Sequence, residues 1–554
     1  MTDLNRRLVR PPSLQKLKAV SARAAFLGLM AGAAVAAEPP AAPVASKAAA
    51  AQVAALPVFD VYQYVVAGNS VLNALEIESA VTPFLGTGKN LRDVEAARAA
   101  LEKSYHDAGY LTVVVSIPDQ AVDAGEVQLQ VVEAVIERLK VAGAGYTLAS
   151  GIKAGVPELA AGNVPNFKNI QDQLAVVNRR PDSRVTPVLR AGSLPGTVEV
   201  QLDVEDQLPL HGSVELNNRQ TPNTTATRLM GNLRYDNLWQ LGHSLNLTLQ
   251  TSPERSGDAQ VAALTYVLPT GRANDALSIY AVRSRSVFAS LANSPGLGLL
   301  GDSDSLGMRY SAPLKGSTET AQSLSAGFDY KDIRQTTKLP DGSGIASPVS
   351  YVSLAGGYSL NLFGPERSSS LDLSTALGMR QLGGTSDAEF DAKRKGASAS
   401  FVAFRGGLRH NDAWQGWGLL GRFDFQLASG PLLPSEQMSA GGADSVRGYL
   451  EGERAGDIGV HASFELRTPV YSPAGVGSAW RLGGLAFLDV ARLSTLRAVA
   501  PQPGQYSLAG IGLGLRLTAP GGVALDLDAA SALVDGDATS AHSIRVHARA
   551  VLAF

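Results

Sequence analysis

The pattern of hydrophobic and polar residues changes at about Leu208. Before that point, alternating stretches are separated by stretches with helical spacing. After it the helical spacing disappears, and short alternating segments continue to Phe554. Because alternation gives a strand one apolar and one polar face, the sequence predicts an α+β region followed by a long region made of strands.

The α+β region is predicted to hold two modules in tandem, each with the order β-α-α-β-β. The first is predicted to contain helices at 73–81 and 91–106 and strands at 59–66, 111–117 and 127–132. The second is predicted to contain a helix at 170–178 and strands at 138–142, 184–189 and 197–204. Gly109 ends the longest helix, since glycine accepts the left-handed conformation there.

The last strand shows the clearest alternation of the β region. One face carries Ile544, Val546, Ala548, Ala550, Leu552 and Phe554, and the other carries Arg545, His547 and Arg549. A membrane-crossing strand needs about nine to eleven residues, apolar toward lipid and polar toward the lumen, and its sheet must close. A soluble β-sandwich or β-helix also alternates. Repeated charge on the polar faces and an aromatic residue after a full strand favour a transmembrane antiparallel barrel.

The N-terminal residues have the pattern of a secretory signal peptide. A basic stretch precedes the apolar run Ala24–Val35, and Ala34-Val35-Ala36 is a small-x-small cleavage pattern, so cleavage is expected after Ala36 or Ala37. Residues 37–57 are rich in Ala and Pro and read as a tether. No later segment has 18 consecutive apolar residues. An exported chain of this kind is periplasmic, secreted or a membrane β-barrel.

The composition excludes several classes of binding partner and catalytic site. The 554 residues carry a net charge of −2 with no basic block, which argues against nucleic acid as a partner. There is no cysteine, so disulfides, thiolate metal sites and cysteine nucleophiles are excluded. The sequence contains no HExxH, GxxxxGK[ST] or GxSxG motif. We therefore expect no enzyme, no cofactor and no catalytic metal.

One glycine-rich segment interrupts the alternation late in the barrel region. It contains Val446, Arg447, Gly448 and Tyr449 within the stretch Gly441–Tyr449. A lone Arg among glycines suits a polar lumen that offers a carboxylate partner. The alternative is an exposed surface loop.

Several segments resemble two-partner secretion outer-membrane transporters of the hemolysin/hemagglutinin secretion-activation family. Segments 68–72, 105–112, 117–120 and 125–131 resemble their first POTRA (polypeptide-transport-associated) domain, and 178–181 with Val185, Gly192 and Gly196 resembles the second. Residues 236–242 and 266–269 resemble the hairpins at the barrel entrance. The VRGY tetrad matches the family's pore loop. Phe487 and Asp489 match the partner motif F-x-D-x-G, although Ala491 replaces its glycine.

The resemblance implies a 16-strand barrel in which Arg447 pairs with Asp489 and holds the loop tip against the wall. Together with the predicted signal peptide at 1–36 and tether at 37–57, it implies POTRA domains at 58–137 and 138–207 and a barrel at 208–554 that ends on Phe554 as its C-terminal signal. A plug helix before the first POTRA domain is not expected from so short a tether.

The implied function is secretion of a partner exoprotein across the outer membrane of a Gram-negative cell. The POTRA domains would bind the unfolded cargo in the periplasm, and a single copy of the barrel would sit among outer-membrane lipids. The main alternative is a barrel-assembly insertase, whose members usually carry three or more POTRA domains. A passive porin lacks such modules, and an enzyme barrel would need a nucleophile–base pair.

Overall fold

The computed structural model describes residues 57–554, apart from 123, 179, 223, 271–274, 291–297, 339–343, 381, 383–385, 473–479 and 500–502. The predicted signal peptide and nearly all of the predicted tether lie outside the described residues. None of the described helices is long and apolar enough to cross a membrane.

The first module packs two helices against a small sheet. Its elements are β1 (Phe59–Val61), β2 (Gln63–Ala67), α1 (Ala74–Val81), a 3₁₀ turn (Thr82–Phe84), β3 (Gly86–Lys89), α2 (Leu91–Ala108), β4 (Val114–Ser116) and β5 (Glu126–Val132). The sheet order is β2-β5-β4, and β1 pairs separately with β3. Asn73 and Asn90 each begin a helix with a capping box. Gly109 ends α2 at a φ of 107°.

The second module repeats this arrangement. Its elements are β6 (Val135–Ala142), α3 (Ala149–Gly155), a 3₁₀ turn (Pro157–Leu159), α4 (Phe167–Val177), β7 (Ser183–Ala191) and β8 (Thr197–Asp206). Strand β8 lies between β6 and β7, parallel to the first and antiparallel to the second. Burial alone would raise the pKa of Asp206. Three backbone N–H groups, from Gly145, Tyr146 and Thr147, bind its carboxylate and hold the pKa below its usual value.

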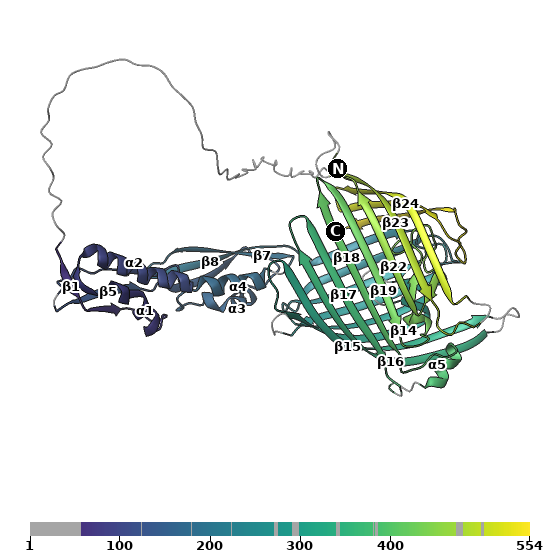
Figure 1. Ribbon diagram of the computed structural model, residues 1–554, viewed down its shortest axis with the longest axis horizontal. Helices are drawn as coiled ribbons and strands as arrows, with labels where there is room; N and C mark the ends of the chain where they lie inside the picture. The colour runs from purple at the N-terminus through teal and green to yellow at the C-terminus, as the bar shows by residue number, and fades with distance from the viewer. Residues whose placement is uncertain are drawn as a thin grey trace, which may run out of the picture. The chain divides into compact units, whose positions relative to one another are not determined.

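The rest of the described chain forms a closed antiparallel barrel of sixteen strands, which confirms the predicted fold class (Figure 1). The strands are β9 (Leu210–Asn217), β10 (Arg228–Leu238), β11 (His243–Thr251), β12 (Ala259–Pro269), β13 (Ala276–Ser290), β14 (Gly298–Leu314), β15 (Thr320–Lys338), β16 (Gly344–Phe363), β17 (Arg367–Gly378), β18 (Val402–Trp414), β19 (Trp417–Ala428), β22 (Ile458–Arg467), β23 (Arg481–Ser494), β24 (Gln505–Ala519), β25 (Val523–Ala532) and β26 (Ile544–Ala553). Strand β26 pairs with β9 and closes the ring.

The alternation places apolar side chains outside and polar ones inside. In β26, Ile544, Val546 and Leu552 are exposed, whereas His547 between them is 5% exposed. The outward residues face lipid, because a closed barrel leaves no other apolar environment for them.

The barrel's connections follow from its antiparallel order. The modules precede β9, so β9 starts at the periplasmic end, and every second connection lies on the extracellular side. The connections after β17, β19, β23 and β25 are therefore extracellular. One of them contains α5 (Asp387–Lys393), which Figure 1 shows at one end of the barrel. The expectation that helices end at about Leu208 is wrong at this point. A seven-residue helix is too short to leave a clear period, although Ser386 and Glu389 form a capping box.

This topology can be tested by cysteine labelling, because the chain contains no cysteine of its own. Lys395, beside α5, has a side chain 76% exposed, and Lys153 on α3 is also exposed. Intact cells treated with a membrane-impermeant maleimide should label Lys395→Cys and spare Lys153→Cys. Both variants should react after lysis. Labelling of Lys153→Cys in intact cells would contradict the assigned orientation.

Candidate functional site

The connection between β19 and β22 folds inward as a long hairpin. A 3₁₀ turn (Pro434–Glu436) leads into β20 (Met438–Ala440), which pairs with β21 (Arg454–Gly456). Between them, residues 441–453 form the loop that carries the VRGY tetrad. Gly441 and Gly442 have φ values of 105° and 107°, which side chains rarely adopt. The backbone N–H of Gly442 then donates to the carbonyl of Val446 at 3.1 Å and folds the loop into a compact tip.

Arg447 at the loop tip binds the barrel wall through its whole guanidinium group. Its Nε and Nη2 donate to the two oxygens of Asp489 at 2.7 and 2.9 Å, and its backbone N–H also donates to Asp489 at 3.1 Å. Its Nη1 donates to Glu465 at 2.8 Å. The guanidinium carbon lies 3.5 Å from the centre of the Phe487 ring, a cation–π contact. The predicted partner residues therefore lie together in the structure.

The pair is nearly sealed from solvent and its charge is balanced locally. Arg447 is 4% exposed and Asp489 is 0% exposed. Glu465 also accepts two hydrogen bonds from Arg467. Asp528, 3.7 Å from Nη1 of Arg447, is bound by Arg516. Three arginines thus face three carboxylates, which offsets the cost of removing these charges from water.

The apolar residues of the tetrad fill a small core against the same wall. Val446 and Tyr449 are fully buried with Leu493, Leu508 and Ala532. The Tyr449 hydroxyl donates to the carbonyl of Val534 at 2.6 Å. Gly448, at a φ of 101°, donates its N–H to Nε2 of His547 at 3.1 Å.

A glycine on the wall makes this contact possible. A Cβ on Gly510 would lie 1.9 Å from the carbonyl oxygen of Arg447, so no other residue fits there without displacing the loop.

A second set of contacts holds the loop on its other side. Asp444 forms a bidentate ion pair with Arg219, which follows β9, and its carbonyl accepts a hydrogen bond from Arg422 at 2.9 Å. The imidazole of His461 lies 3.0 Å from the carbonyl oxygen of Ser445. The loop is therefore attached to strands β19 and β22–β26 and to the connection after β9.

A polar cavity of about 820 Å³ lies in the lumen. It is lined by residues of β10–β18 together with Glu436, and these include Asn232, Asn246, Thr248, Arg309 and Asp329. The inward hairpin thus fills one part of the lumen, and another part is a cavity lined by polar side chains.

The sequence-predicted residues fall in two places. Val446, Arg447, Gly448, Tyr449, Phe487 and Asp489 meet at the loop tip, whereas Phe554 lies at the closure of the barrel. Its ring stands where a Cβ on Gly212 would be, and the two residues exchange backbone hydrogen bonds at 2.9 Å. Glu465 and Ser463 were not predicted as partners of Arg447. Polar and apolar residues alternate along β22 and put both on its polar face, but this pattern does not show which residue they meet.

Comparison with known proteins identifies the family. Residues 196–517 match the haemolysin secretion/activation protein family ShlB/FhaC/HecB, and residues 59–134 match the ShlB-type POTRA domain. The chain belongs to the haemolysin secretion/activation protein family. It is an outer-membrane transporter of two-partner secretion, with its POTRA domains in the periplasm, as the sequence predicted.

The individual relatives agree with this assignment. The chain is 26% identical to the outer membrane transporter CdiB of Dickeya dadantii, over 72% of this chain and 70% of the relative. The structure of CdiB from Escherichia coli superposes with a TM-score of 0.61 at 22% identity, covering 92% of this chain and 93% of that one. BamA from Haemophilus ducreyi lacking POTRA domains 1–3 shares the fold, with a TM-score of 0.52 at 14% identity over 90% and 100% of the two chains.

The burial of Arg447 and Asp489 predicts strong energetic coupling between them. Removing one member of a buried pair costs about 3–5 kcal/mol, and a polar lumen reduces this value. Arg447→Ala should cost more than Asp489→Ala, because it leaves Asp489 without a cation and Glu465 with Arg467 alone, whereas the reverse change leaves Arg447 with Glu465. The double variant should be little less stable than Arg447→Ala. Denaturant unfolding of the refolded barrel measures these values, and simple additivity of the two costs would contradict the coupling.

Proposed function

We propose that this transporter secretes a hemolysin- or adhesin-like exoprotein and that the VRGY loop controls the opening of its lumen. The ion pair of Arg447 with Asp489 is the observation that carries this proposal. It fixes the tip of an extracellular connection to the inner wall, through contacts that can be broken and remade without changing any strand. Release of the tip would widen the path beside the 820 Å³ cavity.

We further propose that unfolded cargo docks on the POTRA domains by adding a strand to a sheet edge. Strand β4 stands at one edge of the first sheet, and its Val114 is 56% exposed. Two side chains of α2 occupy the outward backbone groups of Val115, since Glu102 accepts from its N–H at 3.1 Å and Arg98 donates to its carbonyl at 3.2 Å. An extended segment would replace these contacts with backbone hydrogen bonds, which depend little on its sequence. An apolar side chain beside the edge adds affinity for an apolar segment.

The remaining features of the proposal follow from the sequence. The chain acts as a single copy without catalysis, cofactor, metal-dependent chemistry or nucleic acid. It is divided into a signal peptide (1–36), a tether (37–57), two POTRA domains (58–137 and 138–207) and a barrel (208–554). Phe554 serves as the C-terminal signal of the barrel. The insertase alternative is less well supported, because the described residues contain two modules rather than three or more.

The loop proposal predicts a secretion defect without loss of the barrel. Arg447→Ala frees the loop tip, so we expect the amount of cargo in the medium to fall severalfold while the amount of heat-modifiable barrel in the outer membrane stays near wild type. The matched control is Arg309→Ala, since Arg309 forms a lumen ion pair with Asp329 and is not among the contacts of the loop described above. Normal secretion by Arg447→Ala at normal abundance would end the proposal.

The docking proposal predicts a site-specific crosslink. A photoreactive amino acid at Val114 of the full-length chain should crosslink to the co-expressed exoprotein during secretion, because that side chain borders the edge of β4. The same group at Lys153, exposed on helix α3, should give little product. Equal crosslinking at both positions, or none at Val114, would argue against docking at this edge.

A further inference from the structure

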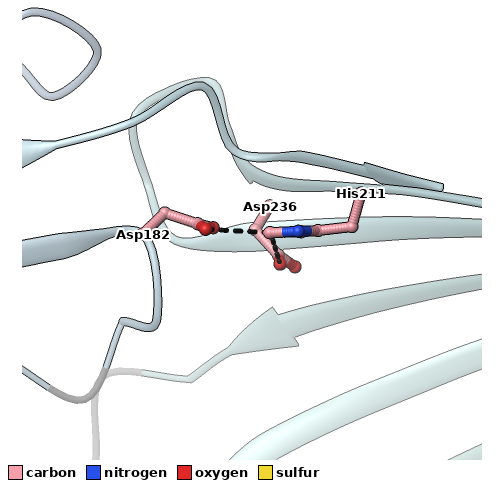
Figure 2. Close-up of side chains that lie close together, drawn as sticks. All are labelled: Asp182, His211 and Asp236. Atoms are coloured by element: carbon pink, nitrogen blue, oxygen red, sulfur yellow. Dashed lines mark ion pairs between the residues drawn. The ribbon is translucent and has the colours of Figure 1, made fainter. Parts of the chain in front are cut away.

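Three potential ligand side chains meet where the second POTRA domain joins the barrel. Asp182 directly precedes β7, His211 lies in β9 and Asp236 lies near the end of β10. One nitrogen or oxygen atom from each lies within 4.8 Å of the others. In Figure 2 the imidazole of His211 reaches between the two carboxylates. Asp236 also lines the polar cavity of the lumen, whereas Asp182 and His211 do not.

The contacts within the cluster leave ligand atoms unsatisfied. Nε2 of His211 lies 2.9 Å from Oδ1 of Asp182 and 3.8 Å from Oδ2 of Asp236. Asp182 is 7% exposed, and its Oδ2 has no hydrogen-bond partner among the described residues. Nε2 of His211 makes no directed hydrogen bond either. A buried carboxylate oxygen without a partner is costly, so its presence calls for a ligand.

The spacing of these atoms suits a small divalent cation. Zinc bound by imidazole nitrogen and carboxylate oxygen has bonds of about 2.0–2.2 Å, which places two tetrahedral ligands about 3.3 Å apart. The observed separations of 2.9 and 3.8 Å bracket this value. The mixed nitrogen and oxygen donors favour zinc or a similar transition metal over calcium and magnesium, which prefer oxygen alone.

We propose that Asp182, His211 and Asp236 bind a divalent transition-metal ion, with Zn²⁺ as the best fit, that clamps the second POTRA domain to the mouth of the barrel. Water completes the coordination, because the chain supplies three ligands here. The ion is structural and takes no part in moving cargo.

Two neighbouring contacts define how the site behaves. The side chain of Gln240 already bridges this junction, since its Oε1 accepts from the N–H of Leu148 and its Nε2 donates to the carbonyl of Tyr146, both at 3.1 Å. The ion would add a second, reversible link beside it. Arg234 lies with its Nε 3.0 Å from Oδ2 of Asp236 and competes with a cation for that carboxylate. Removing Arg234 should therefore tighten binding.

Zinc titration of the full-length, detergent-purified protein tests the site. The protein should carry no polyhistidine tag, and its folding should be verified by heat-modifiable migration. Wild type should bind one Zn²⁺ per chain and show a higher unfolding temperature with zinc. His211→Gln and Asp182→Asn, which keep the size of the side chains, should weaken binding by about tenfold or more. Arg234→Ala should strengthen it, and His243→Ala, on the adjacent strand β11, should leave it unchanged.

Cobalt supplies an independent readout. Co²⁺ added to wild type should produce the visible absorption of a tetrahedral site. His211→Gln should abolish this absorption, and excess Mg²⁺ or Ca²⁺ should leave it unchanged because neither should displace the bound Co²⁺. The proposal is overturned if wild type binds no Zn²⁺ or Co²⁺. It is equally overturned if His211→Gln and Asp182→Asn bind zinc as wild type does, because the metal then lies elsewhere.

Discussion

In a hydrocarbon environment a backbone N–H or C=O group has no water to bind, so each membrane-crossing strand needs a neighbour on both sides. The closed sixteen-strand ring satisfies that requirement, and the rest of the structure is arranged around it. Closure forces every strand to present one face to lipid and the other to the lumen. It thereby creates an interior where charged residues are tolerated and where a loop can be held by ion pairs.

The inward hairpin occupies that polar interior. Its tip is held both by charge and by apolar burial. Arg447 faces carboxylates of β22, β23 and β25, while Tyr449 and Val446 pack on apolar residues of the same wall. Either set of contacts alone would fix the loop less firmly. Together they hold the loop tip in one defined position. The free-energy cost of burying Arg447 there depends on how much water reaches its guanidinium group.

The sequence predicted the fold and the residues that meet at the loop tip. The features that it did not predict have physical reasons. Alternation identified the lumen face of β26, and helical spacing identified α2, because both periods extend over many residues. Helix α5 was missed because seven residues between strands leave no period. The requirement for glycine at Gly510 could not be predicted, because it comes from contact with a loop about sixty residues earlier in the chain. The group of Asp182, His211 and Asp236 joins segments whose spacing in the sequence resembles no metal motif.

The closure between β9 and β26 also governs how the protein is made. Glu215 and Arg549, which form an ion pair across this seam, are 334 positions apart in the sequence. Contacts of such long range form late, because a long stretch of chain must first be ordered. Until then the first and last strands are both unpaired edges that any other extended chain can join. The cell must therefore keep this polypeptide extended and shielded throughout its passage across the periplasm.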